Sequence, residues 1–222
     1  MTKTELIWGW LYLFIQLLIL PSILVIGNLI LGSPLSDSLL NFLMFAVNFI
    51  AVTVIFHRFL WNSLRQALHT PWRCLRGAFI GFALHYLGSF LVNLLISFIY
   101  PEFVNVNDQS IISMTQEHFT LMTLGTVFLV PVAEEALYRG LIFRTLYQKI
   151  PAAAYIVSAL VFSAIHVIGY IGIYEPAHLA LCFLQYIPAS FALGFAYAKA
   201  DNIWAPILMH ITVNQVGILS MR

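Results

Sequence analysis

Three charged residues stand close together in a chain that otherwise carries few charges. Only 9% of its 222 residues are Asp, Glu, Lys or Arg, yet the stretch AEEALYRG contains Glu134, Glu135 and Arg139. On a helix, Glu135 and Arg139 at i, i+4 can form an ion pair along one face, while Glu134 points about 100° away. This spacing predicts that Arg139 holds Glu135 charged and fixed, and that Glu134 is left free for chemistry.

Imidazole and amide groups follow on two later apolar segments. His166 ends the pattern FSAIH, and HITVN places His210 and Asn214 four residues apart. A carboxylate or an imidazole can take a proton from water, and a His/Asn pair can donate hydrogen bonds to the oxyanion of a tetrahedral intermediate. These groups together supply what hydrolysis of an amide bond needs. Cys182 and Ser163 match no nucleophile motif, so attack by water is the simpler mechanism.

The composition indicates the surroundings in which these residues must lie. Hydrophobic residues make up 61% of the chain and the mean hydropathy is +0.92, whereas a soluble domain has roughly 45–50% apolar residues. We therefore predict a membrane protein, in which each ionisable side chain within the bilayer faces protein or a water-filled cavity. The net charge of +1 gives no indication of a nucleic-acid partner.

Polar interruptions divide the chain into apolar segments long enough to be membrane helices. The pattern predicts an all-α, polytopic transmembrane helical bundle of about seven to eight spans. The segments are 6–32, 39–56, 75–100, 119–143, 152–168, 179–198 and 203–220.

Two connections between these segments have a distinct character. Residues 57–76 are amphipathic, which predicts a short helix at the membrane interface, and residues 101–118 are polar and acidic, which predicts a water-exposed loop. A cytoplasmic N-terminus places most of the ten Lys and Arg residues on the cytoplasmic side, in agreement with the positive-inside rule. No linker is long enough to divide the chain, so residues 1–222 are predicted to be a single membrane domain.

The three motifs, in this order on successive predicted membrane helices, resemble those of the CAAX protease and bacteriocin-processing family. This family is also known as Abi and includes the Ras-converting enzymes. Its patterns EExxxR, FxxxH and HxxxN correspond to residues 134–139, 162–166 and 210–214. The resemblance extends over about residues 119–219, which we expect to form the catalytic core, while residues 1–118 supply the N-terminal spans and the amphipathic connection.

The resemblance implies an intramembrane endopeptidase in a cell membrane, here a bacterial plasma membrane, that acts on a peptide or a small membrane protein. By analogy, Glu134 is the general base for water and His166 assists it. His210 and Asn214 then form the oxyanion hole, and Glu135 and Arg139 shape the site.

The resemblance leaves the use of a metal open. Members of the family have been described as metalloproteases, and a glutamate mechanism without a metal is the competing view. A zinc site with two His ligands and one Glu would use Glu134, His166 and His210. Because Asn is a poor zinc ligand and suits an oxyanion hole, the HxxxN pair favours the mechanism without a tightly bound metal.

Substrate and cellular role also stay open at this level. Prenylated C-a-a-X peptides are the eukaryotic and archaeal precedent, whereas a short bacterial chain is expected to process leader peptides of bacteriocins or pheromones. Two alternatives are a non-catalytic membrane protein that confers immunity by binding, and a transporter that uses the buried Glu, His and Arg residues. Most of these polar groups fall in the last four segments, which disfavours transport.

Overall fold

The computed structural model describes residues 1–30, 32 and 34–220, and their secondary structure is helical throughout apart from one isolated bridge between Ile171 and Tyr174. The predicted all-α, polytopic helical bundle is confirmed. The elements in chain order are α1 (Lys3–Leu18), α2 (Leu20–Ile30), α3 (Asp37–Ile55), α4 (His57–His69), α5 (Pro71–Ile99), α6 (Val106–Glu117), α7 (Phe119–Thr123), the π-helix η1 (Leu124–Leu129), α8 (Val130–Glu135), the π-helix η2 (Ala136–Phe143), α9 (Arg144–Tyr147), α10 (Pro151–Ile165), the 3-10 helix η3 (Ile168–Tyr170), α11 (Pro176–Ala200) and α12 (Trp204–Ser220).

Each predicted apolar segment corresponds to a helix or a run of helices. In the described part of the chain, five stretches are long and apolar enough to cross a membrane, and α1 with α2, bent by 46°, is a sixth candidate. The last predicted segment is α12, which has 17 residues and is not among these candidates. The count of seven to eight spans and the cytoplasmic N-terminus therefore stay predictions.

The two connections differ from their predicted forms. The helix predicted within residues 57–76 is present, but α4 ends at His69 and α5 begins two residues later. Residues 101–118, predicted as a loop, contain α6 instead. Asn105 caps this helix, because its side-chain oxygen accepts hydrogen bonds from the backbone N–H groups of Asn107 and Asp108 at 3.0 and 3.3 Å. A capped helix that buries Val106, Met114 and Thr115 is more stable than an open loop.

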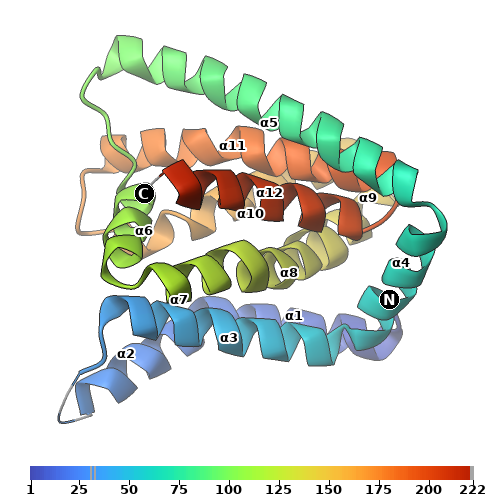
Figure 1. The fold of residues 1–222 in the computed structure, drawn as a ribbon, viewed down its shortest axis with the longest axis horizontal. Helices are drawn as coiled ribbons and strands as arrows, with labels where there is room; N and C mark the ends of the chain where they lie inside the picture. Colours follow the sequence, from blue (N-terminus) through green and yellow to red (C-terminus); the bar gives the residue numbers. More distant parts are fainter. Residues whose placement is uncertain (31, 33, 221–222) are drawn as a thin grey trace.

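The helices form layers around the charged motif. Figure 1 shows α1 and α3 on one side of the bundle and α5 on the other, with α7 to α9, α10, α11 and α12 between them. The segment α8 packs against α3 and α12, while α11 packs against α5 and α10. Helix α6 lies across one end of the bundle and α4 lies at the opposite end (Figure 1). This arrangement places the end of α8, which carries the charged motif, near the centre of the molecule.

Two π-helical segments flank α8. All eight residues of η2 are buried, from Ala136 to Phe143, and they include Arg139. Short π-helical stretches widen a helix, alter the direction of its side chains and occur often at functional sites. The motif AEEALYRG therefore spans the change from α-helix to π-helix.

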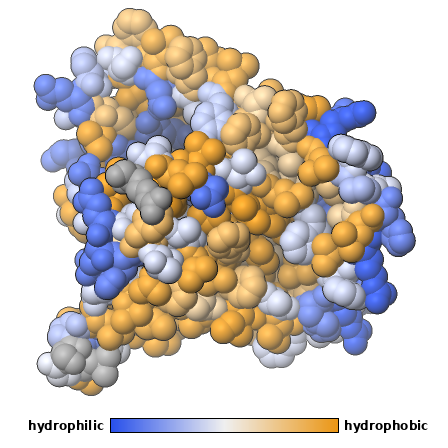
Figure 2. All heavy atoms as spheres, viewed as in Figure 1, coloured by the Kyte–Doolittle hydropathy of each residue, from blue (hydrophilic) through white to orange (hydrophobic). Residues whose placement is uncertain are grey.

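The surface agrees with a membrane environment. Figure 2 shows apolar side chains over the middle of the molecule and hydrophilic ones gathered at its two ends. Phe79 and Phe98 on α5 are 74% and 79% exposed. Large apolar side chains at such exposure suit contact with lipid rather than with water.

Candidate active site

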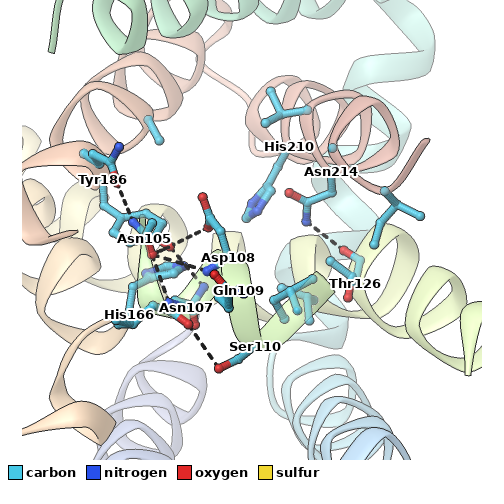
Figure 3. A pocket seen from close by; sticks show the side chains of 18 of the residues that line it. Asn105, Asn107, Asp108, Gln109, Ser110, Thr126, His166, Tyr186, His210 and Asn214 are labelled. Atoms are coloured by element: carbon cyan, nitrogen blue, oxygen red, sulfur yellow. Dashed lines mark hydrogen bonds between the residues drawn. The ribbon is translucent and has the colours of Figure 1, made fainter. Parts of the chain in front are cut away.

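The predicted site residues fall into two groups, those that line a cavity and those that are fully buried behind it. A cavity of about 1430 Å³ is lined by Glu134, His166, His210 and Asn214. Glu135 and Arg139 have no exposed surface and lie behind the cavity wall. In Figure 3, His166 lies on one side of the cavity and Asn214 on the other, with His210 between them. Groups from α8, from the end of α10 and from α12 thus reach one space.

Glu134 is the carboxylate of the charged motif that lines the cavity. It is the penultimate residue of α8, and its neighbour Glu135 is directed away from the cavity into the buried core. The Oε2 atom of Glu134 is buried and accepts no hydrogen bond from the described residues. Because Glu134 lines the cavity, its carboxylate is the candidate base for a water bound there.

Glu135 and Arg139 form the ion pair that their spacing predicts, and this prediction is confirmed. Arg139 Nη1 lies 3.2 Å from Glu135 Oε1, and neither side chain is exposed. Arg139 Nη2 also donates to the carbonyl and to the hydroxyl of Ser190, at 3.2 and 3.0 Å. The guanidinium group lies 4.4 Å from the centre of the Phe162 ring. Additional hydrogen bonds of this kind offset part of the cost of burying an ion pair, although Glu135 Oε2 and Arg139 Nε have no hydrogen-bond partner among the described residues.

Ser190 extends this buried network to a further helix. Its hydroxyl donates to the carbonyl oxygen of Ser158 at 3.1 Å, which joins α11 to α10. The network therefore holds α8, η2, α10 and α11 together at the level of the site. Neither serine was part of the sequence prediction, because a serine in an apolar helix has no distinguishing pattern.

His210 is held by Glu135, a contact that the sequence did not predict. Its Nδ1 atom lies 2.9 Å from Glu135 Oε1. A carboxylate oxygen only accepts, so Nδ1 is the donor and Nε2 is the ring nitrogen left for other partners. Glu135 therefore orients His210 of α12 as well as pairing with Arg139.

His166 has a defined tautomer for a similar reason. It caps the C-terminus of α10, and its Nδ1 atom lies 2.7 Å from the carbonyl oxygen of Phe162. Because a carbonyl only accepts, Nδ1 carries the hydrogen and Nε2 presents a lone pair in the neutral ring. The ring stacks on Tyr186 with a centroid distance of 4.1 Å. This form of His166 is able to accept a hydrogen bond from water.

Asn214 is fixed to the π-helical segment η1. Its Nδ2 atom donates to the carbonyl oxygen of Thr126 at 2.7 Å (Figure 3). This bond uses one of the two amide hydrogens, which leaves the second for a ligand in the cavity. The side-chain amide is thus both positioned and able to donate.

Polar residues of α6 and α11 complete the cavity and were missed by sequence reasoning. The Tyr186 hydroxyl donates to Asp108 Oδ1 at 3.0 Å and accepts from Asn107 Nδ2 at 3.0 Å. The Asp108 side chain is exposed, yet the protein atoms around it partly desolvate its carboxyl group and raise its pKa, and the hydrogen bond from Tyr186 offsets part of this rise. The polar stretch NVNDQS was the available signal, but nothing in it indicated that it lies against the cavity.

The zinc site that was considered as an alternative is not formed by the side chains as they lie in this structure. Within the part of the chain that the structure describes, no three His, Cys, Asp or Glu residues are grouped so that they could hold a metal ion. Glu134, His166 and His210, the three residues that such a site would use, are therefore not grouped as metal ligands here.

Comparison with known proteins agrees with the motifs. Residues 116–216 match the family model described as Type II CAAX prenyl endopeptidase Rce1-like. A curated protein of Bacillus subtilis (strain 168), named "Putative membrane peptidase YdiL", is 29% identical over 114 residues, which cover 51% of this chain and 42% of that relative. No solved structure matches the chain. The resemblance inferred from the motifs is confirmed for this region, and the chain is a multi-pass membrane protein.

Proposed function

Because residues 116–216 match the Rce1-like family, we propose that this chain is an intramembrane endopeptidase that hydrolyses a peptide bond with water activated by Glu134 and His166. The observation that carries the proposal is the single cavity onto which Glu134, His166, His210 and Asn214 converge from three helices. These groups comprise a base, an acceptor that orients water, and hydrogen-bond donors for an oxyanion.

The chemistry begins with water bound between Glu134 and His166. Glu134 takes one proton, Nε2 of His166 accepts a hydrogen bond from the same water, and the oxygen adds to the carbonyl carbon of the substrate. The resulting oxyanion accepts a hydrogen bond from Asn214 Nδ2. Glu134 then gives its proton to the leaving amine, the C–N bond breaks, and an amine and a carboxylic acid are formed. The acid passes its remaining proton to Nε2 of His166 or to water and leaves as the carboxylate.

His210 contributes the second donor in this proposal. With Nδ1 donating to Glu135, Nε2 donates to the oxyanion only when the ring carries both protons. The imidazolium would face the carboxylate of Glu135, which Arg139 in turn holds in place. This chain of contacts follows the logic of an imidazole oriented by a buried carboxylate.

The proposed substrate is a peptide segment rather than a small metabolite. The cavity, at 1430 Å³, exceeds the roughly 300–1,000 Å³ typical of small-molecule sites. Among its described lining residues, Asp37, Asp108, Glu117 and Glu134 are acidic, and neither Lys nor Arg is included. Because a free C-terminal carboxylate would find no Lys or Arg there, we propose cleavage at an internal bond of a membrane-associated peptide, such as a leader peptide, which also admits a role in bacteriocin immunity.

The decisive experiment compares new peptide termini in cells that express the wild-type chain or Glu134→Gln at equal membrane levels. Termini found only with the wild type, identified by mass spectrometry, would establish proteolysis and identify the substrate. Identical termini with both folded proteins would refute the proposal and favour binding or transport. Glu102→Gln is the matched control, because Glu102 is exposed and lies outside the cavity lining.

A further inference from the structure

Two aromatic rings lie against the imidazole of His166. Phe162, one turn earlier on α10, lies on one side with ring centroids 4.6 Å apart. Tyr186 of α11 stacks on the ring with centroids 4.1 Å apart and an angle of 24° between the planes. Tyr186 is therefore the support for His166 that comes from another helix.

His166 needs such support because its own backbone restrains it weakly. The residue is the C-cap of α10, where the regular helix ends. The second side-chain torsion of histidine has broad minima. The single hydrogen bond from Nδ1 to the Phe162 carbonyl therefore does not by itself fix the orientation of the ring. A flat partner against the ring face removes this freedom and sets the direction of Nε2.

Tyr186 is in turn held by α6. Its hydroxyl accepts from Asn107 Nδ2 and donates to Asp108 Oδ1, both at 3.0 Å. The adjacent Gln185 accepts a hydrogen bond from Asn105 Nδ2 at 2.7 Å. Three successive polar contacts therefore attach the first turn of α6 to the part of α11 that carries Tyr186.

We propose that Tyr186 is a positioning residue for His166, and that Asn107 and Asp108 of α6 hold Tyr186 in place. The stacked ring directs Nε2 of His166 into the cavity, and the hydroxyl contacts prevent Tyr186 from turning away. The inference rests on the proposed function for its catalytic meaning, while the positioning itself can be measured without activity. Helix α6, which lies outside the candidate spans, thereby becomes part of the site.

The kinetic test separates the ring of Tyr186 from its hydroxyl. Tyr186→Leu removes both and is expected to lower kcat about 10- to 100-fold with little change in KM, because small displacements of a catalytic group have effects of this size. Tyr186→Phe keeps the ring, so its kcat is expected to fall less than that of Tyr186→Leu. Tyr170→Phe is the control, since the Tyr170 hydroxyl contacts Ser110 of α6 at 2.9 Å and its ring contacts Tyr174. Near wild-type turnover in Tyr186→Leu would overturn the proposal.

A double-mutant comparison shows whether the effect passes through His166. In a His166→Ala background, Tyr186→Leu is expected to cause no further loss of kcat, because there is no imidazole left to position. Independent losses that multiply would mean that Tyr186 acts by another route and would overturn the proposal.

A second measurement does not depend on proteolysis. Diethyl pyrocarbonate modifies unprotonated imidazole nitrogens, and mass spectrometry gives the rate at His166 relative to the exposed His57. Tyr186→Leu is expected to change the relative rate at His166, whereas Tyr186→Phe and Tyr170→Phe are expected to leave it close to the wild-type value. An unchanged rate in Tyr186→Leu would overturn the positioning role. A changed rate in a protein without proteolytic activity would support the positioning role and refute the proposed function alone.

Discussion

Glu135 and His210 are 75 residues apart in the chain, yet Glu135 Oε1 lies 2.9 Å from His210 Nδ1. The same carboxylate oxygen lies 3.2 Å from Arg139 Nη1. One buried oxygen therefore joins the charged motif on α8 and η2 to the last helix. The Glu135 carboxylate is thus the point at which two of the three sequence motifs meet.

Replacement of Glu135 is expected to destabilise the fold as well as the site. Glu135→Gln keeps an oxygen that can accept hydrogen bonds but leaves the buried Arg139 guanidinium without its counter-charge. Loss of one partner of a buried ion pair costs about 3–5 kcal/mol. Unfolding of the purified protein in detergent measures this change, with the exposed Glu102→Gln as control. Equal stability of Glu135→Gln and wild type would contradict the buried pair.

Arg139→Lys is expected to fold poorly although it keeps the charge. Arg139 makes hydrogen bonds to Glu135 and to two atoms of Ser190, and an ammonium group cannot reproduce this planar arrangement. Each lost bond to a charged group costs about 1.5–3 kcal/mol. Membrane yield and cleavage rate should both fall, whereas Arg73→Lys, at an exposed position, should behave as wild type. A folded Arg139→Lys protein with full turnover would remove Arg139 from the network.

Asn214→Ala is expected to lower kcat about 10²- to 10³-fold, the usual effect of losing one oxyanion donor. The change also removes the contact to the Thr126 carbonyl, so stability has to be measured alongside turnover. Thr212→Ala on the same helix is the matched control, because Thr212 is exposed and its hydroxyl contacts the carbonyl of Leu208. A stable Asn214→Ala enzyme with normal kcat would exclude the oxyanion role.

Chelation is expected to leave proteolysis unchanged, because no group of described residues is arranged to hold a metal ion. Purified protein is treated with EDTA or 1,10-phenanthroline and assayed on a substrate identified from the terminal-peptide comparison. A known zinc protease in the same detergent serves as the control for effective chelation. Loss of activity that added Zn²⁺ restores would show that Glu134, His166 or His210 rearranges to bind metal.

Asp108 is expected to make stability depend on pH. Its carboxyl group has a raised pKa because the protein atoms around it partly desolvate it, so the folded state holds this proton more tightly than the unfolded state. The resulting penalty is absent below the ordinary Asp pKa, appears as pH rises through the raised value, and is complete above it. Asp108→Asn should therefore have the same melting temperature as the wild type at acid pH and a higher melting temperature than the wild type at neutral pH.

Asp108→Asn changes the charge at position 108 without removing the hydrogen bond to Tyr186. Asn at position 108 still offers Oδ1 to the Tyr186 hydroxyl, so the variant removes the charge and keeps the contact. The other titratable groups that face Asp108 are Tyr170, Tyr186 and Cys182. A stability difference that does not vary between acid and neutral pH would show that the Asp108 charge is not the cause.

The spacing of residues within one helix was sufficient to predict part of the site. Glu135 and Arg139 pair because residues four apart face the same side of a helix, and Glu134 faces elsewhere for the same reason. The apolar segments likewise correspond to the observed helices, because burial in lipid requires long runs of apolar residues with internal hydrogen bonds. The catalytic roles of Glu134, His166, His210 and Asn214 stay predictions until the experiments above are made.

Contacts between distant segments could not be predicted from the spacing of residues within one helix. The polar stretch before Phe119 was predicted as a loop, whereas it forms α6, which lies across one end of the bundle (Figure 1) and contributes residues to the cavity lining. Its Asn107 and Asp108 reach Tyr186 across 79 and 78 positions of sequence. Neither π-helical segment has a distinctive local pattern, because the change of register depends on the helices that pack around it.

The sequence by itself determined the environment, the helical segments and the types of reactive side chain, since these depend on hydropathy, helix periodicity and the chemistry of each residue. The tertiary structure decided which of these side chains share a cavity, which nitrogen of each imidazole is left free, and that Glu135 serves Arg139 and His210 at once. The physical reason is that hydrogen bonds between helices depend on differences of about an ångström in packing. Such differences are set by the whole bundle and are not encoded in any one segment.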